Sequence, residues 1–268
     1  MPRILVPAAF LFLLAVSAMA ETHPVTLFTS TGYTAAKARI SREPYVSWMA
    51  RLTAKADAIV AQNIDWPGTA VTREIQSYNA RLLAAAYSLS DTGAANRASW
   101  GREASKALRA LPRSGYKSAF GSDLSVSESA LRYAETYDLL RGAGFGFDTA
   151  DTTGAEAIIR RNLAALRSYM AKNEGNIFGS PSGTFAGDFS SGAFWTVANS
   201  DNHHVKLFAA LSVLALVILD ESGSQGDLDT ARGRLLDTIG NLTVTGDDGS
   251  PAGGWAEGPA YHEYAAHE

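Results

Sequence analysis

The stretch LFAALSVLALVIL, residues 207 to 219, decides the fold class. It contains a single polar residue, Ser212, so a helix formed from it is apolar around its whole circumference. Such a helix must be buried on all sides, because any side facing solvent would expose a row of large aliphatic side chains. We therefore expect this segment to be an inner helix of a chain built mainly from helices.

The rest of the chain has the same helical character. Apolar residues recur at three- and four-residue spacing, which is the period of a helix and not of a strand. One predicted face consists of Ile75, Tyr78, Leu82, Ala86 and Leu89, and another of Ile159, Leu163, Leu166 and Met170. The spacing predicts helices over residues 44–62, 71–90, 95–110, 127–141, 154–173, 202–221, 227–244 and 257 onward.

Local signals and long connections refine this prediction. The helix over 127–141 follows SVSE, residues 125 to 128, a capping-box pattern, and Gly142 and Gly144 favour its end. Gly/Ser/Asp-rich loops are predicted over 111–125, 175–201 and 245–256. Helical hairpins with long loops on one rim predict an all-α fold, an α/α toroid. We expect one domain over 21–268, and we expect the toroid to be incomplete at its C-terminal side.

The first twenty residues have the features of a secretory signal peptide. Arg3 precedes an apolar run from Ile4 to Val16, and Ala18-Met19-Ala20 is a small-residue cleavage site. We expect cleavage after Ala20 and a periplasmic or secreted protein that does not associate with the membrane afterwards. The chain has no cysteine, which excludes disulfides and thiolate metal sites.

Composition narrows the class of partner. The formal charge is -4 at pH 7, so the chain lacks the basic excess that a general nucleic-acid binder needs. An anionic substrate would require a local basic cleft. Arg132, Arg141 and Lys206 could line such a cleft, although charged residues on helices more often form a solvated face.

A first group of candidate residues, Asp201-Asn202-His203-His204, directly precedes the apolar helix. Asp201 or Asn202 can cap that helix, which places both histidines in its first turn. The helix dipole there disfavours imidazolium, and free backbone N–H groups attract a carboxylate. The structural alternative is that Asn202 only caps the helix and one histidine fills a polar corner of the core.

A second group lies in GGWAEGPAYHEY, residues 253 to 264, where a glycine-rich turn leads into a predicted helix. Tyr261 and Tyr264 are three residues apart and share a face, so one can enter a cleft while the other supports it. Tyrosine can act as a general acid where its neighbours lower its pKa. The alternative is that both are core residues of an amphipathic helix. His262 and His267 are five residues apart, which does not fit a helical zinc motif, so we predict no metal and no cofactor.

Together these residues resemble a known family, the heparinase II/III-like and alginate lyase-like polysaccharide lyases. The resemblance rests on HPVTLFT, residues 23 to 29, on Asn202-His203 before an apolar helix, and on EGPAY, residues 257 to 261, after a Gly-Gly-Trp turn. It implies an α/α toroid, usually followed by a β-sandwich domain, and β-elimination at a uronic acid of an anionic polysaccharide. Because family members carry further cleft residues in later parts, we expect this chain to be a fragment.

The resemblance also implies roles for individual residues. Asn202 would neutralise the uronate carboxylate, His203 would be a second clamp or the base, and Tyr261 would be the acid or acid/base. We further predict substrate contacts for His204, Tyr133, Tyr137, Trp255, Glu257 and Tyr264.

Two other functions remain open at this level. Helical toroids also host inverting glycoside hydrolases, for which Asp201 and Glu257 would be the two acids, although capping explains both residues. The same helices could instead form a non-catalytic exported glycan-binding protein. Of the three functions, only the lyase creates an unsaturated product, so this product distinguishes it from the other two.

Overall fold

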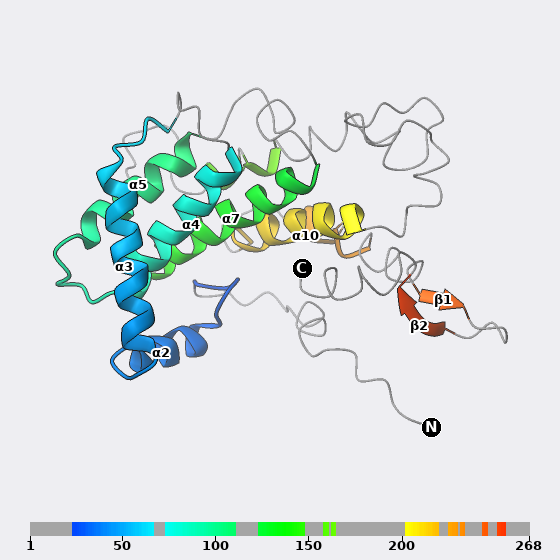
Figure 1. Ribbon diagram of the computed structural model, residues 1–268. Helices are drawn as coiled ribbons and strands as arrows, with labels where there is room; N and C mark the ends of the chain where they lie inside the picture. Colours follow the sequence, from blue (N-terminus) through cyan, green and yellow to red (C-terminus); the bar gives the residue numbers. More distant parts are fainter. Residues whose placement is uncertain are drawn as a thin grey trace.

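The computed structural model describes residues 23–66, 73–110, 123–147, 158–160, 162–164, 202–219, 225–229, 231–233, 243–245 and 251–255 of the 268-residue chain. These parts are mostly helical, which confirms the predicted class (Figure 1). The long helices are α2 (Ser30–Arg39), α3 (Tyr45–Ala61), α4 (Arg73–Leu89), α5 (Arg97–Arg109), α7 (Asp123–Gly142) and α10 (Asn202–Leu216). The strands are β1 (Thr243–Thr245) and β2 (Pro251–Trp255).

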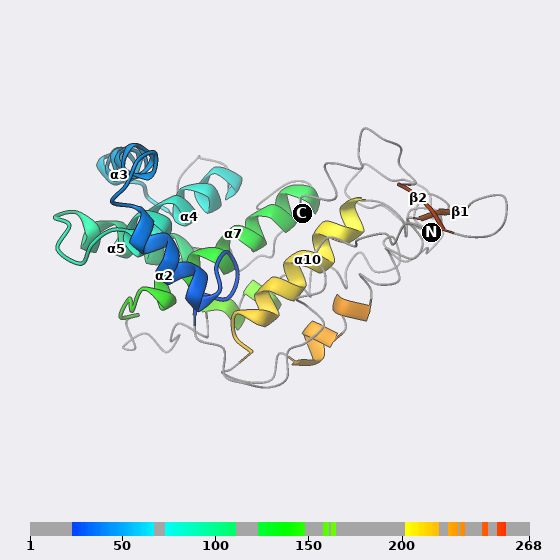
Figure 2. The same ribbon diagram turned by 90° about the horizontal axis from the view of Figure 1, so that it is seen from below.

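Helices α4, α7 and α10 lie side by side and run in the same direction (Figures 1 and 2). Along α4 and α7 the contacting pairs advance together, from Ser77 with Ser129 to Arg81 with Glu135. The start of α10 likewise contacts the early part of α7, where the Lys206 ammonium lies 3.0 Å from a carboxylate oxygen. The starts of all three helices therefore lie at the same end of this layer.

Helix α5 packs beside α4 in the opposite direction. Arg97, in the first turn of α5, donates to the carbonyl of Tyr87 near the end of α4. Farther along α5, Glu103 accepts a hydrogen bond from Trp66, whose own carbonyl accepts one from Gln76 near the start of α4. Helix α3 also packs on α4 and on α5. The layer of parallel helices thus has α3 and α5 against one of its sides.

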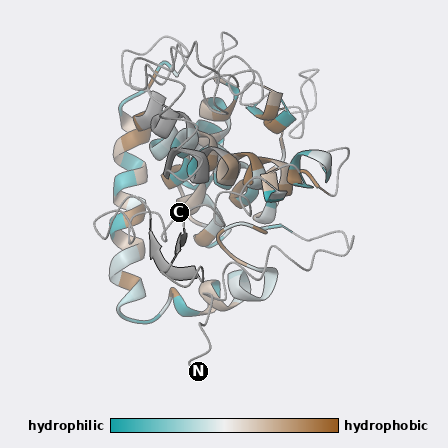
Figure 3. Ribbon diagram, turned by 90° about the vertical axis from the view of Figure 1, so that its right-hand side faces the viewer, coloured by the Kyte–Doolittle hydropathy of each residue, from teal (hydrophilic) through white to brown (hydrophobic). Residues whose placement is uncertain are grey.

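The apolar segment that leads the sequence argument is buried as predicted. Within 206–219 none of the side chains that the structure describes is exposed, and Ser212 satisfies its hydroxyl on the carbonyl of Phe208 at 2.8 Å. Hydrophobic residues concentrate in the helices at the centre of the view in Figure 3, while hydrophobic and hydrophilic residues alternate along α3 at the edge. The predicted burial of α10 is therefore confirmed, and its place in a ring of helices stays a prediction.

The predicted face of α4 is wrong in part. Ile75 is 49% exposed and Tyr78 is 38% exposed, whereas Ala86 of the same predicted stripe is buried and Leu82 packs partly buried against the core. The other buried residues of α4 are Gln76, Ser77, Ala80, Leu83, Ala84, Tyr87 and Ser88. Small and polar residues face inward because α4 packs closely against α3, α5 and α7, and close helix packing leaves little volume for long side chains.

The bounds of α7 differ from the prediction at one end only. The helix begins at Asp123, so residues 125 to 128 lie inside it and do not form a capping box. Its predicted end is confirmed: Gly144 has a φ of +72°, and Phe145 N–H donates to the carbonyl of Leu140 at 2.9 Å. This is the hydrogen bond of a glycine-terminated helix.

Two further elements were not predicted. Helix α2 buries none of its residues, so it carries no apolar periodicity that a sequence pattern could reveal. The helix predicted over 227–244 and the loop over 245–256 are both wrong in part, because β1 and β2 pair antiparallel there, with Thr243 opposite Trp255. The β-branched run Thr243-Val244-Thr245 favours a strand, and the glycine-rich composition of β2 concealed its partner.

Candidate functional site

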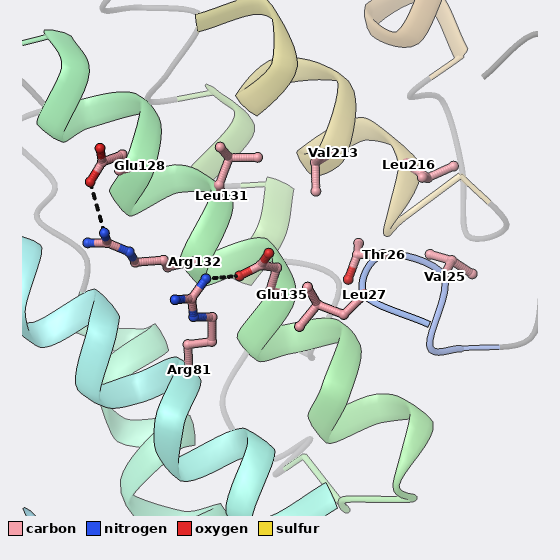
Figure 4. A pocket seen from close by; sticks show the side chains of 10 residues that line it. All are labelled: Val25, Thr26, Leu27, Arg81, Glu128, Leu131, Arg132, Glu135, Val213 and Leu216. Atoms are coloured by element: carbon pink, nitrogen blue, oxygen red, sulfur yellow. Dashed lines mark hydrogen bonds and ion pairs between the residues drawn. The ribbon is translucent and has the colours of Figure 1, made fainter. Parts of the chain in front are cut away.

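A cavity of about 460 Å³ lies on the face of the parallel helices that the N-terminal segment crosses (Figure 4). Its lining comes from four parts of the chain: the segment 25–27 and helices α4, α7 and α10. The lining residues are Val25, Thr26, Leu27, Arg81, Glu128, Leu131, Arg132, Glu135, Val213 and Leu216. The α7 residues among them recur every three or four positions, so one helical stripe forms its floor.

One ion pair spans the cavity between α4 and α7. The Arg81 guanidinium donates to a carboxylate oxygen of Glu135 at 2.8 Å. Burial raises the pKa of the Glu135 carboxyl, and the hydrogen bond and charge of Arg81, together with the charge of Arg132, only partly oppose that rise. Glu135 therefore accepts a proton more readily than an exposed glutamate does.

A second charged group joins α7 to α10. Glu128 accepts a hydrogen bond from Arg132, one turn further along α7, at 2.8 Å, and another from Lys206 at 3.0 Å. The Lys206 side chain is buried, so the lysine does not belong to a solvated face. Lys206 lies four residues after Asn202, about 6 Å along a helix axis. Lys206 therefore lies about one turn from the start of α10, whereas Val213 and Leu216, the residues of α10 that line the cavity, lie about three to four turns from it.

The segment after the predicted signal peptide is fixed against α7 by one buried carboxylate, that of Asp138. One of its oxygens lies 2.6 Å from His23 Nδ1, and Val25 N–H approaches both oxygens, at 2.9 and 3.0 Å. The other oxygen accepts from Thr26 N–H at 2.8 Å and from the Thr26 hydroxyl at 2.6 Å. These contacts hold residues 25–27 in place as one wall of the cavity.

Glycine at position 142 allows this segment to approach the end of α7. A Cβ atom built there would lie 2.5 Å from Cδ of Pro24 and 2.6 Å from its nitrogen. Both distances are far below ordinary contact, so any larger residue would push the segment away from Asp138.

No family model matches the chain, and neither a curated protein nor a solved structure is significantly similar to it.

The two tyrosines predicted to touch substrate lie in the core. Tyr133 and Tyr137 are both 0% exposed. The hydroxyl of Tyr137 accepts a hydrogen bond from Arg141 at 2.8 Å, and its ring packs edge-on against His23 and beside Phe147. A substrate could reach neither ring unless the segments that cover it moved. Contact between these two tyrosines and a substrate therefore stays a prediction.

The predicted catalytic residues are described only in part. Asn202 begins α10, and His203 and His204 follow in its first turn, as expected. The orientation of these three side chains is not described. Trp255 ends β2. Asp201, Glu257, Tyr261 and Tyr264 lie outside the described residues, so their predicted roles stay predictions.

Arg132, which the sequence indicates as a possible cleft residue, lines the cavity. Arg81, Glu135 and Asp138 were not predicted. A spacing signal existed for Glu128 and Arg132, which stand four residues apart and pair on the helix. No spacing could pair Arg81 with Glu135, because these residues are 54 positions apart and meet only through helix packing.

The described part of the chain contains no group of three or more His, Asp or Glu residues that could hold a metal ion. Among the same residues, no helix is both long and apolar enough to cross a membrane.

Proposed function

We propose that this protein is an exported polysaccharide lyase, of the heparinase II/III and alginate lyase type, that cleaves a uronic-acid-containing polysaccharide by β-elimination. The observation that carries the proposal is the position of Asn202 and His203. They open a buried helix whose start lies at the same end as the starts of α4 and α7. Residues 1–20 would direct export and leave after Ala20.

The arrangement of helices supports an α/α toroid. In a ring of helical hairpins each outer helix returns the chain to the same end, so the inner helices all run in one direction. Helices α4, α7 and α10 run in one direction, and α5 runs the opposite way beside α4. These directions support an arc of inner helices with one outer helix, as we propose for a toroid.

Parallel inner helices also give this end of the layer a favourable potential for anions. Each helix start carries a partial positive charge from its unpaired N–H groups, and three such starts lie on the same side. The substrate of β-elimination is a uronate, whose carboxylate must be stabilised before the C5 proton can leave. Positive helix ends together with Asn202 and His203 would supply that stabilisation.

In the proposed reaction, Asn202 and His203 hold the carboxylate while charge develops on it. His203 or Tyr261 takes the C5 proton, the C4–O bond breaks, and Tyr261 gives a proton to the departing glycosidic oxygen. One product ends in a new reducing end, and the other carries a C4–C5 double bond in the uronate at its new nonreducing end. His204, Trp255, Glu257 and Tyr264 would contact the substrate around this centre.

The test is the ultraviolet absorbance of the unsaturated uronate, followed with the full chain on alginate, heparan sulfate and polygalacturonate. We expect absorbance to rise with one polymer and the rise to be lost in His203→Ala and in Tyr261→Phe. Arg102→Gln, an exposed change on α5, is the control and keeps full activity. New reducing ends without absorbance would replace the lyase by a hydrolase, and no cleavage of any polymer would favour a glycan-binding protein.

A further inference from the structure

The cavity between the N-terminal segment and the parallel helices is lined by charged side chains of both signs. Arg81 and Arg132 line it together with Glu128 and Glu135, and the nearby carboxylate of Asp138 acts on Glu135 as well. Because burial raises the pKa of Glu135, this carboxyl opposes an approaching anion less than an exposed one would.

The two arginines also retain hydrogen-bonding capacity that faces the cavity. A guanidinium group has five N–H donors in a planar fork. Among the described residues, Arg81 donates one hydrogen bond, to Glu135, and Arg132 donates one, to Glu128. Their side chains are 35% and 19% exposed. Both groups can therefore donate further bonds to a ligand without losing their present partners.

The remaining walls are aliphatic. Leu131 from α7 and Val213 and Leu216 from α10 project toward the cavity opposite the segment that carries Leu27 (Figure 4). Leu27 is 48% exposed, so part of its side chain is accessible. The volume of about 460 Å³ falls in the range of small-molecule sites. A matching ligand is small and carries both an anionic group and an apolar face.

We propose that this cavity is a subsite that binds one uronate residue of the polysaccharide, with Arg81 and Arg132 donating to its carboxylate. The aliphatic walls contact the C–H face of the sugar ring. The choice of a uronate rests on the proposed function. A carboxylate suits the planar guanidinium fork, which can donate two parallel hydrogen bonds to it.

Calorimetric titration with saturated trisaccharides of mannuronate, guluronate and galacturonate tests the subsite. Each is compared with its methyl ester, which keeps the ring and removes the charge. Binding is measured in a Tyr261→Phe background, so that no trisaccharide is cleaved. We expect one trisaccharide to bind at least about tenfold more tightly than its ester, since hydrogen bonds between charged groups are worth about that factor or more.

Arg81→Gln and Arg132→Gln should each weaken binding of the charged trisaccharide by about tenfold or more and leave binding of the ester unchanged. Arg102→Gln on α5 is the matched control and changes neither. Arg81 is the safer variant, because its partly exposed side chain contributes little to folding, and circular dichroism checks both variants. Equal affinity for acid and ester, or an affinity that neither arginine variant alters, would overturn the subsite.

The subsite and the lyase can fail separately. If no polymer yields an unsaturated product, the lyase proposal fails, yet an affinity difference between acid and ester that depends on both arginines would still support a uronate site. If product forms but neither arginine variant alters binding, the lyase stands and the subsite is wrong.

Discussion

Asp138→Asn should release the N-terminal segment from the helices. In the folded chain the Asp138 carboxylate is buried and accepts from four donors, His23 Nδ1, Val25 N–H, Thr26 N–H and the Thr26 hydroxyl. Asparagine has nearly the same shape but turns one acceptor oxygen into a donor. Whichever way the amide turns, about two of the four donors then meet an N–H group instead of an oxygen.

The size of the expected loss in stability follows from the charge of the Asp138 carboxylate. A hydrogen bond to a charged group contributes about 1.5–3 kcal/mol, so the loss of two gives about 3–5 kcal/mol. The loss is limited by the free energy with which the segment docks, because a detached segment satisfies its donors in water. Thr26→Val removes one of these bonds and should cost about 1–2 kcal/mol.

Urea unfolding gives the change in stability, and hydrogen exchange followed by mass spectrometry locates it. We expect faster exchange in residues 23–29 of Asp138→Asn, a smaller effect in Thr26→Val, and none in Asp91→Asn, whose side chain is exposed. If Asp138→Asn stays within about 1 kcal/mol of the unaltered protein and exchange in 23–29 does not change, the carboxylate does not anchor this segment.

Three further changes test the packing around the cavity. Burial raises the pKa of Glu135 in the folded chain, so its carboxyl favours folding most at low pH and loses that contribution as pH rises. In urea titrations Glu135→Gln should therefore gain stability relative to the unaltered protein as the pH rises from about 4 to 7. A difference in stability that stays constant over this range would contradict the prediction. Gly142→Ala should displace the N-terminal segment and lower stability by about 1–3 kcal/mol, measured by the same titrations. Lys206→Met should lower the free energy of unfolding by about 1–3 kcal/mol. In a double-mutant cycle, adding Glu128→Gln should restore part of that loss. If the effects of the two substitutions simply add, the two side chains do not interact.

The sequence predicts the helices of this chain better than their faces. A run with one polar residue in thirteen could only be an inner helix, and α10 is buried as that argument requires. In α4 the same logic placed Ala86 correctly but failed for Ile75 and Tyr78, because much of the inward face consists of residues such as Gln76, Ser77 and Ala80. Close packing among several helices selects small side chains there, and a search for large apolar residues selects the outer side instead.

The cavity could be predicted only in fragments. Glu128 and Arg132 pair within one helix, so spacing reveals them, whereas Arg81 meets Glu135 across two helices. Asp138 stands among buried aromatic and aliphatic residues of α7, and its partners are backbone N–H groups more than 110 positions away. No local pattern indicates such a contact, since it depends on where the N-terminal segment crosses the helix layer.

The most direct test of the proposed function is product analysis after incubation of the full chain with alginate, heparan sulfate and polygalacturonate. We predict that one polymer gives oligosaccharides with an unsaturated uronate at the nonreducing end, seen by ultraviolet absorbance and by mass spectrometry as the loss of water relative to a hydrolysis product. Saturated oligosaccharides from any of them, or intact polymers throughout, would contradict a lyase.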